Sequence, residues 1–469
     1  MKYYLTVDFG STFTKMCAVD AENKKILGTS RAFTTITTDV RAGYQKALTD
    51  LEMVTGKIGY SQKLACSSAG GGLKMIAVGL VPELTARAAK MAASSAGAKV
   101  IKTYSYELNT RELDEIYSAN PDILLLCGGT DGGNREVVIG NAEKISGIKK
   151  NFSVIYAGNK SAADEAEKLL LNSGKNTVVC GNVMPVFNVL DIVPAKNAIR
   201  SLFIEKIIDA KGLSEIQKEM TSEIIPTPLA VLEGAELFSK GYEGTEGIGE
   251  FMAVDAGGAT TDVYTMCGGE PAVSNAVIKG LPEPFAKRSV EGDLGLRYSI
   301  DSLIESASYK KTAADLRLDE NIVSSWVSAC QKDPGIISGA GSDNRRIDEY
   351  PTAHAIKTAV ERHCGTSECV YTPLGETIII TGKDLTKVPM VIGTGGPIIN
   401  SLDPVKILGS VVFDPTSPGF LKPVKPKFYL DRKYIFASMG LIGRIDPAAA
   451  LKIMKDEITE VNNGQQTQE

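Results

Sequence analysis

The chain has 469 residues, more than one hydrophobic core usually serves, so two or more domains are expected. Apolar residues make up 43% and charged residues 23%, and the net charge of −5 lacks the basic excess that marks nucleic-acid or anionic-membrane binding. An acidic residue at position 8 comes too early for a signal peptide, and no apolar run approaches the roughly 18 residues of a membrane span, which together predict a cytoplasmic protein.

Residues 1–63 read as strands with turns between them and are predicted to form the N-terminal part of a first lobe. The expected strands are Tyr3–Val7, Thr14–Val19 and Ile26–Phe33. The first two are predicted to form a hairpin, because Asp8-Phe-Gly-Ser-Thr-Phe-Thr-Lys15 places turn residues between them.

Residues 64–180 are organised differently and are predicted to be a domain inserted within the first lobe. Short apolar strands alternate with helical patterns such as Leu73–Ala96 and Ser161–Leu171. This alternation indicates a small parallel sheet with helices on both faces, as in a flavodoxin-like α/β domain. The expected strands are Leu64–Ser68, Lys99–Thr103, Asp122–Cys127, Ser153–Ala157 and Thr177–Cys180.

Residues 181–245 are predicted to complete the first lobe and residues 246–460 to form a second. Amphipathic helices are expected at Ala195–Ala210 and Leu229–Phe238, and the polar loop Gly241–Gly249 marks the boundary between the lobes. Residues 300–363 are mostly helical and polar, and a hairpin and the strand Val388–Ile392 follow them. The polar tail at 461–469 is predicted to be disordered.

The second lobe repeats the acidic-glycine turn of the first, because Phe251–Val254 leads into Asp255-Ala-Gly-Gly-Ala-Thr-Thr-Asp262. A triphosphate needs backbone N–H groups that glycines leave accessible, hydroxyl donors, and carboxylates for Mg²⁺. Either turn alone fits an ordinary hairpin as well, but two copies favour a phosphate clamp between two lobes. The candidate residues are Asp8, Gly10, Ser11, Thr12 and Lys15 in the first turn, and Asp255, Gly257, Gly258, Thr260, Thr261 and Asp262 in the second.

A third glycine turn, Val391-Ile-Gly-Thr-Gly-Gly-Pro397, follows an apolar strand. Glycines at 393, 395 and 396 would let a base or ribose lie against the backbone, and the position of this turn after the second acidic turn gives it weight. The chain has no P-loop signature, no dinucleotide-binding glycine order and no arrangement typical of a serine hydrolase. The acidic loop Glu291–Gly295 fits a helix cap and a role near a metal equally well.

The eight cysteines are scattered, which suits reduced thiols in a cytosolic protein. One cluster, His363-Cys364 with Cys369, stands near the only other histidine, His354. Its spacing is not a standard zinc pattern and a fourth ligand is not evident, so a structural loop is favoured over a metal site.

Taken in order, these motifs resemble those of the actin/Hsp70/sugar-kinase ATPase superfamily. Asp8–Thr12 is similar to its first phosphate motif, Asp255–Asp262 to its second and Val391–Pro397 to its adenosine motif. Ser438–Gly443 resembles the late connecting helix, and Ala195–Ile208 the earlier one. Across essentially the whole chain, the sequence resembles the MutL-type (GlmL-type) accessory proteins of coenzyme-B12-dependent glutamate mutase, notably at Pro284–Gly295, Thr381–Leu385, Val391–Gly396 and Tyr434–Pro447.

The resemblance implies an α/β fold with two actin-like ATPase lobes and the inserted domain, with ATP and Mg²⁺ as cofactors. It implies that Asp8 and Asp262 lie near Mg²⁺, that Asp255 and Asp8 are the catalytic carboxylates, and that Asp255 positions or activates the attacking water. Thr12 and Thr260 would bind phosphates, and Gly395 and Gly396 would line the adenosine. The acidic residue of the earlier connecting helix cannot be assigned, so the water-activating group is open between Asp255 and another residue.

The function implied is that of a reactivating chaperone, which uses ATP-driven domain movement to release damaged cobalamin from an adenosylcobalamin-dependent mutase. The chain itself carries no Asp-x-His-x-x-Gly cobalamin-ligating motif. The insert, with the architecture of a cobalamin-binding subunit, is hypothesised to compete for that subunit's place on the mutase. The alternatives are a small-molecule kinase on the same fold and a scaffolding protein with nucleotide-controlled assembly. A homo-oligomer is compatible with the sequence.

Overall fold

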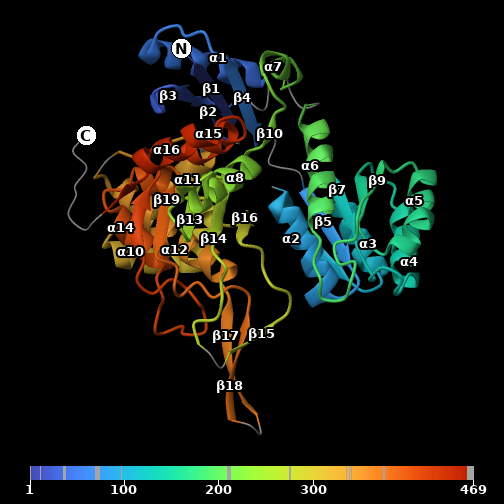
Figure 1. The fold of residues 1–469 in the computed structure, drawn as a ribbon. Coiled ribbons are helices and arrows are strands. Elements are labelled where there is room, and N and C mark those ends of the chain that lie inside the picture. The colour runs from blue at the N-terminus through green and yellow to red at the C-terminus, as the bar shows by residue number, and fades with distance from the viewer. Residues whose placement is uncertain are drawn as a thin grey trace.

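The computed structural model describes residues 2–10, 12–34, 39–68, 74–96, 98–208, 213–273, 276–333, 335–336, 338–339, 341–372 and 375–461. Within these ranges, two mixed sheets share one arrangement of strands (Figure 1). In each sheet the first strand of a hairpin pairs in parallel with a later strand, and that strand pairs in parallel with one that leads into a helix. The duplicated α/β fold expected from the sequence is therefore confirmed.

The first sheet, in the order β10-β4-β1-β2-β3, matches β20-β19-β13-β14-β16 of the second, which adds β21 at its edge. We call these sheets and their helices the first and second lobes. The first sheet contains β1 (Tyr3–Phe9), β2 (Phe13–Asp20), β3 (Lys25–Phe33), β4 (Gln62–Ser67) and β10 (Ile225–Pro226). The second contains β13 (Phe251–Ala256), β14 (Thr261–Met266), β16 (Ala286–Glu291), β19 (Met390–Thr394), β20 (Lys427–Leu430) and β21 (Thr459–Glu460).

Two helices that follow the corresponding strands β10 and β20 cross between the lobes: α8 (Thr227–Lys240) and α15 (Ile435–Gly443). They approach so closely that a Cβ on Gly234 would lie 2.5 Å from the Phe436 carbonyl oxygen, and one on Gly440 would overlap that of Ala230. Apolar side chains of both helices join strands of both lobes in one hydrophobic cluster. The expectation that Ala195–Ile208 is the earlier connecting helix is therefore wrong, because this segment, in α6 (Val193–Ile208), packs on the inserted domain.

The inserted domain, which we call the insert, contains a separate sheet of parallel strands in the order β6-β5-β7-β8-β9 (Figure 1, right). Its strands are β5 (Lys74–Gly79), β6 (Lys99–Ser105), β7 (Ile123–Leu126), β8 (Ser153–Tyr156) and β9 (Thr177–Val179). Its helices are the π-helix η1 (Pro82–Ala86), α2 (Arg87–Ser95), α3 (Thr110–Ala119), α4 (Glu136–Ser146), η2 (Lys160–Ala162) and α5 (Ala163–Asn172).

Two expectations for the insert are wrong. The strand predicted at Leu64–Ser68 is β4, which pairs with β1 of the first lobe. The helix predicted for Leu73–Ala96 starts instead with a strand, because Met75–Val78 form the fully buried centre of β5, between β6 and β7. A strand covered on both faces has an apolar run that periodicity alone does not separate from a helix.

The remaining helices surround the two sheets, and a small three-stranded sheet projects from the second lobe (Figure 1, bottom). None of the helices in the described ranges has the length and apolar character needed to cross a bilayer. The helices are α1 (Val40–Thr55), α7 (Leu213–Glu219), α9 (Ile300–Ala307), α10 (Tyr309–Leu316), α11 (Glu320–Lys332), α12 (Asp343–His363), α13 (Gly396–Ile399), α14 (Pro404–Leu408), η3 (Gly409–Val411) and α16 (Pro447–Glu457). The projecting sheet contains β15 (Ala276–Lys279), β17 (Thr366–Thr372) and β18 (Gly375–Thr381), and β11 (Gly241–Tyr242) pairs with β12 (Thr245–Glu246).

Candidate nucleotide-binding site

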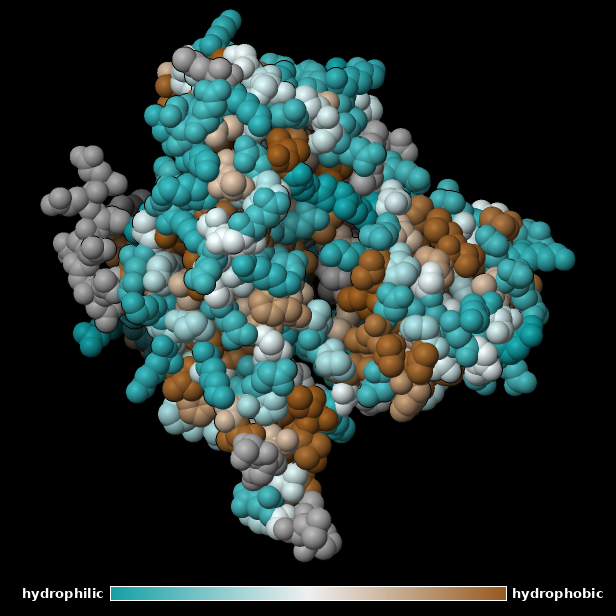
Figure 2. Space-filling view, in the orientation of Figure 1, coloured by the Kyte–Doolittle hydropathy of each residue, from teal (hydrophilic) through white to brown (hydrophobic). Residues whose placement is uncertain are grey.

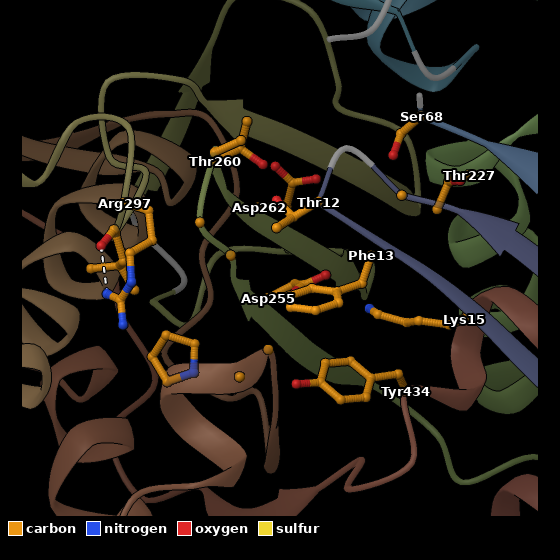
Figure 3. Close-up of a pocket in the computed structure, with 18 of the residues that line it drawn as sticks. Thr12, Phe13, Lys15, Ser68, Thr227, Asp255, Thr260, Asp262, Arg297 and Tyr434 are labelled. Atoms are coloured by element: carbon orange, nitrogen blue, oxygen red, sulfur yellow. Dashed lines mark hydrogen bonds between the residues drawn. The ribbon is translucent and has the colours of Figure 1, made fainter. Parts of the chain in front are cut away.

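A cavity of about 370 Å³ lies between the two lobes, and both acidic turns open into it (Figure 3). Its volume falls within the range of small-molecule sites in proteins. The third glycine turn, the start of α8 and the residues before α15 complete its walls. The predicted residues that line it are Asp8, Gly10, Thr12, Lys15, Asp255, Gly257, Gly258, Thr260, Asp262, Gly395 and Gly396.

The first turn is the tip of the β1–β2 hairpin. The Gly10 N–H donates to the Phe13 carbonyl at 3.1 Å, and a Cβ on Gly10 would lie only 2.6 Å from that oxygen. Asp8 is directly opposite Lys15 in the ladder, so both side chains lie on one face of the sheet. Asp8 Oδ1 also accepts a hydrogen bond from Thr227 Oγ1 of α8 at 2.6 Å. The start of a connecting helix thus contacts the first turn directly.

The second turn has the same closure, since the Gly257 N–H donates to the Thr260 carbonyl at 2.9 Å. Here Asp255 is directly opposite Asp262, so two carboxylates share one face of the hairpin. The two turns meet across the cavity, because a Cβ on Gly258 would lie 3.8 Å from Thr12 Oγ1. The clamp-like arrangement of the two turns predicted from the sequence is therefore present in the structure.

Several backbone N–H groups at the turns are available to a ligand. Those of Thr12, Gly258, Ala259 and Thr260 have no hydrogen-bond acceptor among the residues that the structure describes. Successive N–H groups in a turn form a concave site for anions. The second turn is held in this shape from behind, where the Leu296 N–H donates to the Gly257 carbonyl at 3.0 Å and the Arg297 N–H to that of Gly258 at 2.9 Å.

Asp262 is buried and has two different carboxylate oxygens. Its Oδ2 accepts from Arg288 Nη2 of β16 at 2.9 Å and from the Tyr264 hydroxyl at 3.4 Å. Its Oδ1 is buried without a hydrogen-bond partner in the described part of the chain. Burying a carboxylate oxygen without a hydrogen-bond donor costs free energy, and a cation or a water molecule bound to this atom would offset that cost.

Burial raises the pKa of the half-buried Asp255 carboxyl to about 6, and the carboxylates of Asp262, Asp431 and Asp8 add to the shift while Lys15 opposes it. Burial also raises the pKa of Asp431 to about 6, against the opposing effect of the N–H groups of Ile435 and Phe436. Asp431 lies at the end of β20 and caps α15 through these groups, at 2.9 and 3.3 Å. Lys15 is thus a cation whose charge opposes the upward pKa shift of both carboxyl groups.

Of the predicted site residues, two do not line the cavity and a third lies outside the described residues. Thr261 is fully buried and its hydroxyl donates to the Leu294 carbonyl at 2.7 Å. Gly393 is within β19, where a Cβ would lie 2.8 Å from the Ile398 side chain. Ser11 lies outside the described residues. Gly395, by contrast, has a φ of 95° and crosses β13 so closely that a Cβ would overlap the Ala256 carbonyl oxygen.

The sequence did not predict several other residues of the cavity wall. Arg297 forms a bidentate ion pair with Asp348, at 3.1 and 3.0 Å, and Trp326 Nε1 and Ser338 Oγ donate to the same carboxylate. Nothing local in the sequence links these residues. Tyr434 places its ring beneath Lys15 Nζ, 3.9 Å from the ring centroid (Figure 3). Tyr434 begins one of the stretches with a family resemblance, which was a usable signal.

The other candidate sites have structural roles. Arg362 pairs with Glu291 at 2.6 Å and with Asp293 at 2.9 Å. His363 is fully buried between the hydroxyls of Thr265 and Ser289, at 3.0 and 2.7 Å, and burial lowers its pKa. Across the described ranges, no group of three or more His, Cys, Asp and Glu side chains could hold a metal ion.

Fold and site together define a class: a duplicated two-lobed α/β protein with glycine turns facing each other across a cavity lined by both carboxylates and cationic side chains. The sequence matches the family described as "MutL protein" over residues 4–458. It is also 44% identical over 466 residues to "Protein MutL" of Clostridium tetanomorphum, covering 98% of this chain and 100% of that protein. The chain therefore belongs to the MutL protein family.

The solved structures that match this chain share little sequence with it and align with low TM-scores. The diol dehydratase-reactivating factor in nucleotide-free form is 10% identical, with a TM-score of 0.35 over 94% of this chain and 99% of that chain. The ligand-bound xylulose kinase of Lactobacillus acidophilus is 11% identical, with a TM-score of 0.37 over 98% and 93% of the two chains. These scores are too low for either similarity to assign a ligand or an activity.

Proposed function

We propose that this protein is a Mg²⁺-dependent ATPase that reactivates an adenosylcobalamin-dependent mutase of the glutamate mutase kind. The observation that carries the proposal is the pair of acidic turns that meet across one cavity. Lys15 and turn residues whose N–H groups have no acceptor among the described residues line that cavity. Backbone N–H groups, a lysine and carboxylates are what a metal–triphosphate complex requires. The family assignment supports the partner, because the sequence resembles the accessory proteins of that mutase.

Two carboxylates of the cavity fit a magnesium ion. Asp262 Oδ1 is the buried oxygen without a donor, and Asp8 lines the same cavity. Mg²⁺ is commonly held by one or two carboxylates together with phosphate oxygens and water. Asp8 and Asp262 would therefore hold the ion, which when bound neutralises charge on the phosphates.

Asp255 is the proposed acceptor of the proton from the attacking water. With a pKa of about 6, its carboxyl is mostly ionised at neutral pH yet is a better base than an ordinary aspartate. The neighbouring N–H groups of Gly258 and Thr260 would hold phosphate oxygens beside it. No acidic residue stands in the first turn of α8, all of which is described, so Asp255 is the stronger of the two options left open by the sequence.

The helix crossing offers a route from hydrolysis to movement. Thr227, the first residue of α8, hydrogen-bonds Asp8 of the first turn, and α8 crosses α15 at the close contact of Gly234 and Gly440. Hydrolysis would change the distance between the two turns, and the lobes would then rotate about this crossing. Release of damaged cobalamin from the mutase by such a movement is the proposed outcome.

The insert is the proposed contact with the mutase. Its parallel order β6-β5-β7-β8-β9 is the 2-1-3-4-5 order of flavodoxin-like sheets, which supports the hypothesis that it competes with a subunit of that architecture. It also reaches the second lobe, where Arg87 Nη2 pairs with Glu283 Oε1 at 2.7 Å. Deletion of residues 68–180 should abolish mutase binding and spare nucleotide binding; retained mutase binding would refute this part of the proposal.

The decisive experiment is reactivation of a blocked mutase. Glutamate mutase inactivated with cyanocobalamin is incubated with the protein, Mg-ATP and fresh adenosylcobalamin, and mutase activity is followed with time. Activity should return only when both the protein and ATP are present, and the Asp255→Asn variant should fail under the same conditions. No return of activity would contradict the reactivase, and ATP consumption that requires a small hydroxylic acceptor would favour the kinase instead.

A further inference from the structure

Tyr434 has an unusual backbone conformation at the start of α15. Its φ of 55° and ψ of 44° lie in the left-handed region, which is rare for a bulky residue and is found mostly where the surroundings enforce it. The enforcing group is adjacent, since the nearly inaccessible Asp431 accepts the N–H groups of Ile435 and Phe436. The strained residue therefore has a fixed orientation, and its side chain lines the cavity.

The ring lies against Lys15, which among the described residues is the lysine that lines the cavity. Lys15 Nζ is 3.9 Å from the Tyr434 ring centroid, well within cation–π range. Within the described residues the Lys15 ammonium forms no ion pair or hydrogen bond, although Asp8 is its ladder partner and its charge opposes the rise in the pKa of Asp255 and Asp431. The ammonium thus rests on an aromatic face in a cavity lined by carboxylates and by arginines.

An ion pair would turn the Lys15 ammonium toward one carboxylate, whereas the contact with the neutral Tyr434 ring does not. The ring attracts the cation without neutralising it and leaves its N–H donors free for another acceptor. The Tyr434 hydroxyl would also lie 3.5 Å from a Cβ on Gly396, so the ring is next to the third glycine turn. Tyr434 precedes a connecting helix, whereas Lys15 is on β2 of the first lobe, so the contact joins the two.

We infer that Tyr434 is a positioning residue that holds Lys15 toward the phosphates of a bound nucleotide and away from the carboxylates. The inference rests on the proposed nucleotide site and deepens it. Tyr434 acts through Lys15 and not through its hydroxyl. The face of the aromatic ring is the required feature, so a phenylalanine at position 434 should hold Lys15 equally well.

The test is a double-mutant cycle read by calorimetric titration with Mg-ATP. The variants are Tyr434→Phe, Tyr434→Leu, Lys15→Met and the combination of the last two. We expect Tyr434→Leu to weaken binding about tenfold and Tyr434→Phe to bind within about twofold of the unchanged protein. In the Lys15→Met background, Tyr434→Leu should have no further effect, because the ring then has no cation to hold.

Two results would overturn the inference: equal binding by Tyr434→Leu and the unchanged protein, or an undiminished effect of Tyr434→Leu in the Lys15→Met background. A second measurement needs no nucleotide. The ε-methylene protons of Lys15 should show an aromatic ring-current shift in the free protein, kept in Tyr434→Phe and lost in Tyr434→Leu. If the unchanged protein does not bind Mg-ATP, the proposed function fails, and this shift alone then decides whether Tyr434 orients Lys15. Its absence from the unchanged protein would refute the contact.

Discussion

The two acidic turns share a backbone design and differ in the residue opposite the aspartate. Asp8 faces Lys15 across the first hairpin, and Asp255 faces Asp262 across the second. One turn therefore presents a carboxylate beside a cation, and the other presents two carboxylates, one of which is paired with Arg288. The difference fits unequal roles in the proposed site: the first turn supplies a lysine beside its carboxylate, and the second supplies the carboxylate proposed to accept a proton from the attacking water. One ladder position in a duplicated frame is enough to create it.

The largest expected effect follows from removing the charge of Asp255 in the second turn. Asp255→Asn should still bind Mg-ATP and should lower turnover by about 10²- to 10⁴-fold, the usual contribution of a positioned general base. Turnover is measured by phosphate release, and binding by calorimetry. Unchanged turnover would remove Asp255 from the mechanism and would make the difference between the turns one of binding only.

The second prediction concerns the ion pairs of the turns. Arg288→Met leaves the buried Asp262 carboxylate unpaired and should destabilise the protein by about 3 kcal/mol, since breaking a buried pair leaves a charge without compensation. Lys15→Met, the matched change in the first turn, should cost far less because Lys15 has no ion pair among the described residues. Thermal unfolding measures both. Adding Asp262→Asn to Arg288→Met should restore most of the loss, and equal losses for the two single variants would contradict the distinction.

A third comparison uses the glycines of the two turns. A methyl group on Gly10 would press on the Phe13 carbonyl oxygen at 2.6 Å, so Gly10→Ala should destabilise the protein by about 1–2 kcal/mol. On Gly258 the nearest atom is a side-chain carbon of Arg297 at 3.5 Å, so Gly258→Ala should leave stability unchanged. The same methyl group faces Thr12, between the turns, and should weaken nucleotide binding. Melting temperatures and Mg-ATP titrations of the two variants separate these effects, and a stability loss for Gly258→Ala would contradict them.

The sequence predicted the two turns well because each is a local structure. The hairpins β1–β2 and β13–β14 join neighbouring segments, and their register follows from the short turn at Gly10 or Gly257. The third glycine turn was likewise placed correctly through Gly395 and Gly396. That the two acidic turns face each other was inferred from their repetition, since each of the two similar lobes contains one such turn.

Several of the errors and omissions involve contacts between distant segments. The earlier connecting helix was wrongly assigned to Ala195–Ile208 instead of α8, because both segments have a helical pattern and a glycine contact with the distant α15 distinguishes them. The strand at Leu64–Ser68 was assigned to the insert because its partner, β1, lies about 60 residues before it. The pairs Arg297–Asp348 and Lys15–Tyr434 have no local pattern either.

The smallest predicted effect is a pH-dependent difference in stability between the turns. Because the pKa of Asp255 is raised to about 6 in the folded protein, the folded state binds a proton more tightly than the unfolded state between about pH 4 and pH 6. The contribution of this group to stability is therefore present below pH 4 and is lost as pH rises through 6. At pH 7.5, Asp255→Asn should consequently be more stable than the unchanged protein, by about 1 kcal/mol because the side chain remains partly exposed to solvent.

This gain should disappear near pH 4, and a residual slope should remain because burial also raises the pKa of Asp431. Asp8→Asn is the matched control. Asp8 accepts a hydrogen bond from Thr227 at 2.6 Å and faces Lys15, so removal of its charge should not stabilise the protein at either pH. Melting temperatures of the nucleotide-free proteins at pH 4 and 7.5 are sufficient. A gain for both variants would mean that the two turns are electrostatically equivalent. A gain for Asp255→Asn alone would trace their difference to the burial of Asp255, to which the carboxylate across the hairpin adds.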